Sequence, residues 1–117
     1  MKYILVIAIM LSASLTFAQD VKPKFEKQGN VTEATFYHDN GLVAQKGNFN
    51  KENKLHGIWT SFDKEGNKLA IGNYNSGVKV GKWFFWNGQS LKEVDYINNN
   101  IENVNEWENK SSLALRD

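Results

Sequence analysis

Glycine and aromatic residues recur at a fixed spacing along this chain, and that spacing constrains the fold more than any other feature of the sequence. In the segment 66–86, Gly72 and Tyr74 share one side of an expected strand, and Gly81 and Trp83 share one side of the next. A glycine weakens a strand unless something fills the space above it, and a ring from the neighbouring strand is the usual remedy. We therefore expect paired strands in which aromatic rings cover glycines.

The spacing repeats before and after this segment. A turn glycine is followed eight residues later by a ring in three copies, namely Gly41 and Phe49, Gly66 and Tyr74, and Gly88 and Tyr96. In the third copy Val94 stands where the strand glycine is expected, and Trp107 is the expected closing ring. A unit of 22 to 25 residues is one hairpin that cannot bury its own face, so the copies must stack to share a core.

Alternating apolar and polar residues, bounded by turn signals, predict an all-β fold that is an antiparallel meander of tandem hairpins. The expected strands cover 31–38, 42–49, 57–62, 69–74, 80–86, 90–97 and 101–107. The expected tight turns lie at Asn40-Gly41, Glu65-Gly66 and Asn87-Gly88, because Asn and Gly tolerate the positive φ of short hairpins. The polar segment 50–56 is expected to be an exposed loop.

The first 18 residues have the layout of a cleavable signal-peptide helix. Lys2 precedes an apolar run, and Thr16 and Ala18 are small enough for cleavage before Gln19. An uncleaved anchor is the alternative, but the run is shorter than the ~20 residues that span a bilayer. We therefore expect an exported protein, periplasmic or secreted. The remaining segments are expected to be a linker or irregular start at 19–30, the repeat β domain at 31–107 and a flexible tail at 108–117.

Composition excludes several classes of function. Without Lys2 the chain has 13 basic and 13 acidic side chains, and a neutral chain lacks the basic stripe that nucleic acid requires. It has no cysteine, which excludes disulfides and thiolate metal sites. The two histidines, His38 and His56, lie at strand ends with no spacing that brings ligands together. No serine lies in a nucleophile elbow, and no phosphate-binding loop is present. We expect no catalytic residue, no cofactor and no metal, and therefore no enzyme.

Aromatic and basic residues are the remaining candidates for function. Four consecutive rings at 83–86 place two on each face of a strand, so either a two-layer fold buries them as core or two of them form an exposed interaction site. We favour the first interpretation, in which the four rings are part of the core. Lysines in or near equivalent loops at 51, 54, 79 and 82 could make one rim basic enough for weak contact with anionic lipid. The candidate partner-binding residues are Trp59, Lys79, Lys82, Trp83, Phe84, Trp86 and Trp107.

The spacing resembles the MORN repeat family, and more closely its bacterial variant in secreted and antitoxin-like proteins. The residues that carry the resemblance are Y-H-D-N-G-L-V-A-Q-K-G-N-F (37–49), H-G-I-W (56–59), E-G-N-K-L-A-I-G-N-Y (65–74) and V-G-K-W (80–83). The resemblance implies an elongated meander that binds or scaffolds a partner, which would be a protein, a glycan or another envelope component. It equally implies an alternative function, an inhibitor of the antitoxin or immunity type. Neither the partner nor the oligomeric state follows from the sequence.

Overall fold

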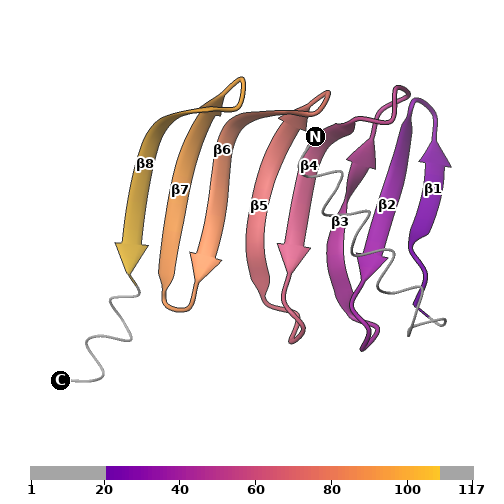
Figure 1. Cartoon of the computed structure of the whole chain (residues 1–117), viewed down its shortest axis with the longest axis horizontal. Helices are drawn as coiled ribbons and strands as arrows, with labels where there is room; N and C mark the ends of the chain where they lie inside the picture. The colour runs from indigo at the N-terminus through magenta and orange to yellow at the C-terminus, as the bar shows by residue number, and fades with distance from the viewer. Residues whose placement is uncertain (1–20, 109–117) are drawn as a thin grey trace.

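The computed structural model describes residues 21–108, and these form a single open antiparallel sheet in which every strand pairs with its neighbours in sequence (Figure 1). The all-β hairpin meander is confirmed, and no helix occurs in the described part of the chain. The expected signal-peptide helix lies outside the described residues. The strands are β1 (Lys24–Gln28), β2 (Val31–Tyr37), β3 (Val43–Phe49), β4 (Leu55–Phe62), β5 (Lys68–Asn75), β6 (Val78–Asn87), β7 (Ser90–Ile97) and β8 (Asn100–Glu108).

The three expected turns are confirmed. Gly41, Gly66 and Gly88 have φ values of 90°, 91° and 61°, a backbone region that favours glycine. The turns at 38–42 and 63–67 are built alike, because the N–H of Gly41 donates to the carbonyl of His38 at 3.0 Å and that of Gly66 to the carbonyl of Asp63 at 3.1 Å. Equivalent turns therefore join β2 to β3 and β4 to β5.

Three expectations were wrong. Residues 24–28 lie within the segment expected to be a linker or irregular start, yet they form β1, which pairs with β2 through all five residues. The loop expected at 50–56 ends earlier, since Leu55 and His56 belong to β4 and Leu55 is buried opposite Phe49. The described chain also forms one layer of eight strands, whereas the core interpretation of residues 83–86 assumed two layers built from six or seven strands. Every strand pairs in the same sheet, and the buried cluster lies along one face of it.

One face of the sheet carries the core, and we call it the indole face. Cross-strand pairing places Ala34 opposite Gly47, Trp59 opposite Gly72, and Trp83 opposite Val94, all on this face. The buried cluster consists of Ala34, Phe36, Leu55, Trp59, Tyr74, Trp83 and Val94, with Phe49, Phe85 and Tyr96 packed against it. A single sheet therefore has a core because large rings cover one face.

The predicted cover of glycines by rings is confirmed at two equivalent positions. A Cβ at Gly72 would overlap the indole of Trp83, and a Cβ at Gly47 would overlap that of Trp59. Each indole N–H donates to the carbonyl of the residue after the covered glycine, Trp83 to Asn73 at 3.1 Å and Trp59 to Asn48 at 2.9 Å. The rings lie directly on the backbone, and their polar atoms are satisfied there.

A β-bulge places each indole over its glycine. The neighbours of Gly72 in β5 pair with Val80 and Phe84 of β6, so that residues 81–83 lie opposite a single glycine. Gly81, the first of the three, has a φ of 70° that a residue with a side chain rarely adopts. The bulge in β4 repeats this geometry, with residues 57–59 opposite Gly47 and a φ of 76° at Gly57.

The third copy lacks this contact. Val94 is buried and occupies the position that a glycine holds in the other copies, and Val104 of β8 lies directly opposite it. An indole from β8 could not lie on the backbone there, because the side chain of Val94 fills the space. Trp107 pairs instead with Leu91 on the other face of the sheet. The expected closing role of Trp107 was therefore wrong, since a valine side chain fills the space that glycine leaves free in the other copies.

The substitution Gly72→Val should lower the free energy of unfolding by about 1–3 kcal/mol, the usual cost of overpacking. The physical reason is that the new side chain must displace the indole of Trp83. Chemical denaturation monitored by tryptophan fluorescence measures the effect. Ala70→Val, two residues earlier on the same face, is the matched control and should cost less, because valine suits a strand. Equal losses in both variants would contradict the contact.

Candidate binding face

The face opposite the core carries a second set of apolar side chains, which we call the outer patch. Ladder pairing aligns Ile71 with Phe84 and, one row further, Trp86 with Leu91 and Trp107. The rings of Phe84 and Trp86 lie 6.4 Å apart and tilted. Trp107 is 47% exposed, and Phe84 and Trp86 are half-buried. The outer patch consists of Leu69, Ile71, Phe84, Trp86, Leu91 and Trp107.

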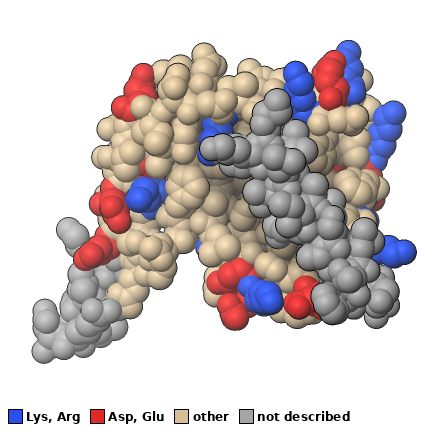
Figure 2. All heavy atoms as spheres, viewed as in Figure 1, with Lys and Arg blue, Asp and Glu red and all other residues tan. Residues whose placement is uncertain are grey.

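The outer patch reaches an open recess at the lower rim of the sheet. The recess has a volume of about 660 Å³ and lies between the turn at 63–67 and the turn that follows β6. Leu69 and Trp86 supply its apolar wall, and Asp63, Asn67 and Gly88 supply polar surface. The lower rim is notched in Figure 2. An apolar wall beside polar groups is the usual composition of a binding site.

A group of paired charges borders the outer patch on the same face. Lys82 Nζ lies 2.8 Å from a carboxylate oxygen of Glu93 and 3.0 Å from one of Asp95. Hydrogen bonds to Glu93 and then to Asp95 raise the pKa of Lys82 above its ordinary value. Glu93 also pairs with Phe84 in the ladder, so the charges adjoin the rings. These groups place paired charges along one side of the apolar surface.

The predicted binding residues do not all converge. The run of four rings divides between the faces, with Trp83 and Phe85 on the indole face and Phe84 and Trp86 in the outer patch. Trp59 and Trp83 are buried in the core cluster. The core interpretation of the run therefore holds for one half and fails for the other, because one layer covers only one of its faces.

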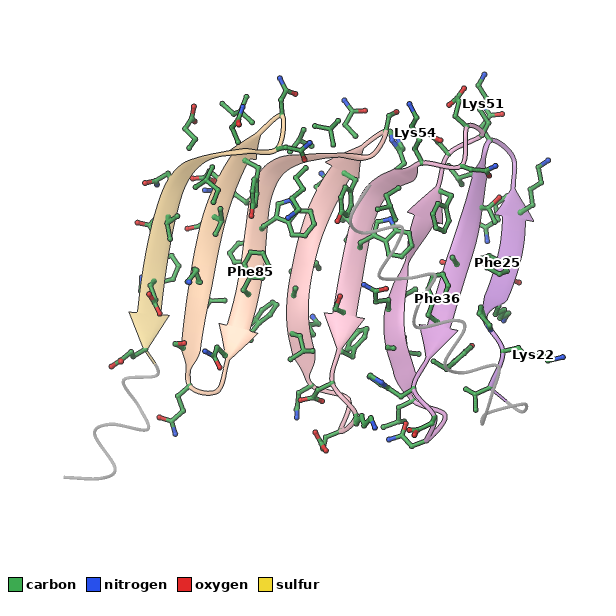
Figure 3. All side chains as sticks on the ribbon, in the orientation of Figure 1. Lys22, Phe25, Phe36, Lys51, Lys54 and Phe85 are labelled. Atoms are coloured by element: carbon green, nitrogen blue, oxygen red, sulfur yellow. The ribbon has the colours of Figure 1, made fainter. Side chains whose placement is uncertain are left out.

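Lys79 and Lys82 also lie on different faces. Lys79 Nζ is 5.2 Å from the ring centroid of Trp83 and 5.1 Å from that of Tyr96, a cation–π position on the indole face. Lys51 and Lys54 lie in the loop before β4 at the upper rim (Figure 3). Lysines and carboxylates are mixed along that rim in Figure 2. The expected basic rim therefore lacks Lys82, whose charge is paired within the sheet.

Both histidines take part in loop structure. His38 Nε2 donates to the carbonyl of Phe62 at 2.8 Å, which ties the first turn to the second. His56 Nδ1 accepts the N–H of Ser76 at 3.1 Å. Within residues 21–108, no three His, Asp or Glu side chains gather as ligands for a metal ion. In the same residues, no helix is long and apolar enough to cross a membrane.

The sequence predicted the rings of the outer patch as binding residues but not its aliphatic members. Leu69, Ile71 and Leu91 were read only as strand formers, although Leu69 and Ile71 alternate with Ala70 and Gly72 of the core face. That alternation was the available signal. It places both residues on the face of Phe84 and Trp86 once the strand register is known.

No family model, no curated protein and no solved structure matches this chain. What the described residues define is a class of architecture, a single-layer antiparallel meander built from hairpin units with ring-covered glycines. The resemblance to MORN repeats stays an interpretation of the sequence.

The recess contains one carboxylate whose titration is expected to affect stability. Hydrogen bonds from Asn67 are the main cause that lowers the pKa of Asp63 below 3.8, with N–H donation by Glu65 adding to it. A lowered pKa stabilises the fold above pH 3.8, and that contribution is lost as the pH falls through the folded-state pKa.

The variant Asp63→Ala should therefore melt at a lower temperature than the wild type at neutral pH, and the difference should shrink as the pH falls below 3.8. Thermal melts by circular dichroism between pH 7 and pH 2 measure it. Asp39→Ala is the control, because the only ion pair of Asp39 in the described chain, to Lys64, spans 3.7 Å at an exposed site. A difference for Asp63→Ala that is constant across the pH range would contradict the role of the turn.

Proposed function

We propose that this protein is an exported, non-enzymatic binding module of the MORN-repeat type that holds a protein partner on its outer patch, in the envelope or outside the cell. The observation that carries the proposal is the exposed apolar surface on the face that the core does not use. Exposed apolar surface that is rimmed by polar groups is typical of interaction sites.

The composition of the outer patch favours a protein partner. Tryptophan and phenylalanine are enriched at the centres of protein interfaces, where rings supply large contact area at little entropic cost. Trp86 lies between Leu69 of the recess wall and Leu91 of β7. A partner that contacts both leucines would therefore also cover the indole of Trp86. We expect Trp86 to supply the largest part of the binding energy.

The paired charges beside the patch would set orientation. Glu93 is mostly buried at its side chain and holds Lys82 at 2.8 Å, so both charges are fixed before a partner arrives. Fixed charges at a rim affect the choice of partner and the association rate more than the affinity. A basic patch for anionic lipid is less favoured on this face, because Lys82 is paired to two carboxylates.

The leader supports the cellular location. An apolar run preceded by Lys2 and ended by small residues is the pattern of exported proteins, and the absence of cysteine removes any dependence on redox conditions outside the cytosol. Mass spectrometry of the exported protein should find an N-terminus at or near Gln19. Retention of residues 1–18 would indicate a membrane anchor instead.

The binding proposal is tested by affinity capture from envelope extract with the full chain, followed by titration of the captured partner. Trp86→Ala should weaken binding by about tenfold or more, the scale of a hot-spot residue. The double variant His38→Ala and His56→Ala should bind as the wild type does. Circular dichroism checks that each variant is folded.

Three outcomes would overturn the proposal. Loss of binding in the histidine variant alone would point to a site at the loop ends. Capture that survives protease treatment of the extract would indicate a glycan. Capture that is abolished by vesicles of anionic lipid would indicate a membrane surface.

A further inference from the structure

The two edges of the sheet are further candidate surfaces, and one of them, β8, also carries Trp107 of the outer patch. β1 and β8 are the outermost strands, and within residues 21–108 neither has a strand on its outer side. Figure 1 shows them at opposite ends of the sheet. An open edge presents unpaired N–H and carbonyl groups, which are a template for another strand.

Strand direction makes the two edges compatible with each other. Antiparallel neighbours alternate in direction, so the first and the eighth strand run in opposite senses, as the arrows in Figure 1 show. A second copy placed beside the first without rotation would bring its β1 antiparallel to β8. The meander would then continue across the junction with the same pairing as inside the sheet.

Apolar residues at the two edges lie on the same face. Phe25 pairs with Ala34, and Val104 pairs with Val94, so both belong to the indole face. Ile101, opposite Tyr96, joins them there. Their exposed fractions are 56% for Phe25, 46% for Val104 and 61% for Ile101. The core face therefore ends at both edges in apolar side chains that remain open to solvent.

The charges of the two edges are opposite. β8 carries Glu102, Glu106 and Glu108 and no basic residue. β1 carries Lys24 and Lys27 against one carboxylate. Figure 3 places Lys22, just before β1, at the same end of the sheet. Two β8 edges would bring glutamates together, whereas β8 beside β1 brings opposite charges together.

We infer that this protein associates with further copies of itself head to tail, with β8 of one copy pairing with β1 of the next. In the antiparallel register that sets Phe25 opposite Val104, Lys27 comes opposite the bulge at Ile101 and Glu102, and all five residues of β1 lie within the span of β8. Such a contact is heterologous and leaves one free edge at each end, so it extends to open chains of copies. The inference does not depend on the proposed function, because it rests on backbone pairing and on apolar residues of the indole face, although Trp107 of β8 also belongs to the outer patch.

Sedimentation velocity of the full chain over a range of concentrations tests the association. The expected result is a size distribution that grows beyond the dimer with concentration and shifts to smaller species at high salt, which screens the edge charges. A monomer at every concentration would overturn the inference, and the glutamates would then serve to protect the edge from pairing.

Two single variants identify the edges involved. Phe25→Lys and Val104→Lys should each weaken self-association by about tenfold or more, because each buries a charge in place of an apolar contact. Ile58→Lys changes an exposed apolar residue of the central strand β4 and is the matched control, with self-association unchanged. Equal weakening in the control would contradict an edge contact.

Mixing the two variants separates head-to-tail pairing from symmetric pairing. Phe25→Lys keeps an intact β8, and Val104→Lys keeps an intact β1, so an equimolar mixture should form a dimer and nothing larger. Dimers in the Phe25→Lys sample alone would show that β8 pairs with β8 and would overturn the head-to-tail arrangement. A mixture that stays monomeric although both variants are folded by circular dichroism would overturn it as well.

Discussion

The contact between a strand glycine and the indole of the next strand is the constraint on which the rest of this sheet depends. Gly72 and Gly47 have no Cβ, so Trp83 and Trp59 lie directly on the backbone and bond to it through their N–H groups. The bulge that swings each indole into place requires a positive φ at Gly81 or Gly57. One unit therefore needs a covered glycine, a bulge glycine and a tryptophan two residues after the bulge glycine, as in Gly57 and Trp59 or Gly81 and Trp83.

This contact also explains how one layer of strands can hold together. Trp83 stacks on Phe85 and meets Tyr74 and Tyr96 edge to face, so a row of rings replaces the second layer that sheets usually need. The opposite face is not needed for the core and carries the apolar residues of the outer patch. Where the contact ends, at Val94 and Val104, the repeat ends with it, and the last strand carries charge at its edge.

The outer patch and the two edges are compatible surfaces, because partner binding uses side chains on one face and edge pairing uses the backbone of β1 and β8. Copies joined edge to edge would present their outer patches in one row on the same side of a continuous sheet. A row of identical sites binds a repeated or clustered partner far more tightly than a single site does, through effective concentration. Chains of copies would therefore bind such a partner with higher affinity than one copy does.

The sequence by itself determined the strands after residue 30, the glycine turns and the cover of glycines by rings, because all of these depend on residue spacing within or between adjacent hairpins. It also contained the aromatic residues of the outer patch. Only the tertiary structure decided which of the four rings at 83–86 face the core, that β1 belongs to the sheet, and that Trp107 lies on the outer face. These results depend on register and on the number of layers, which arise from pairing between strands and not from local propensity.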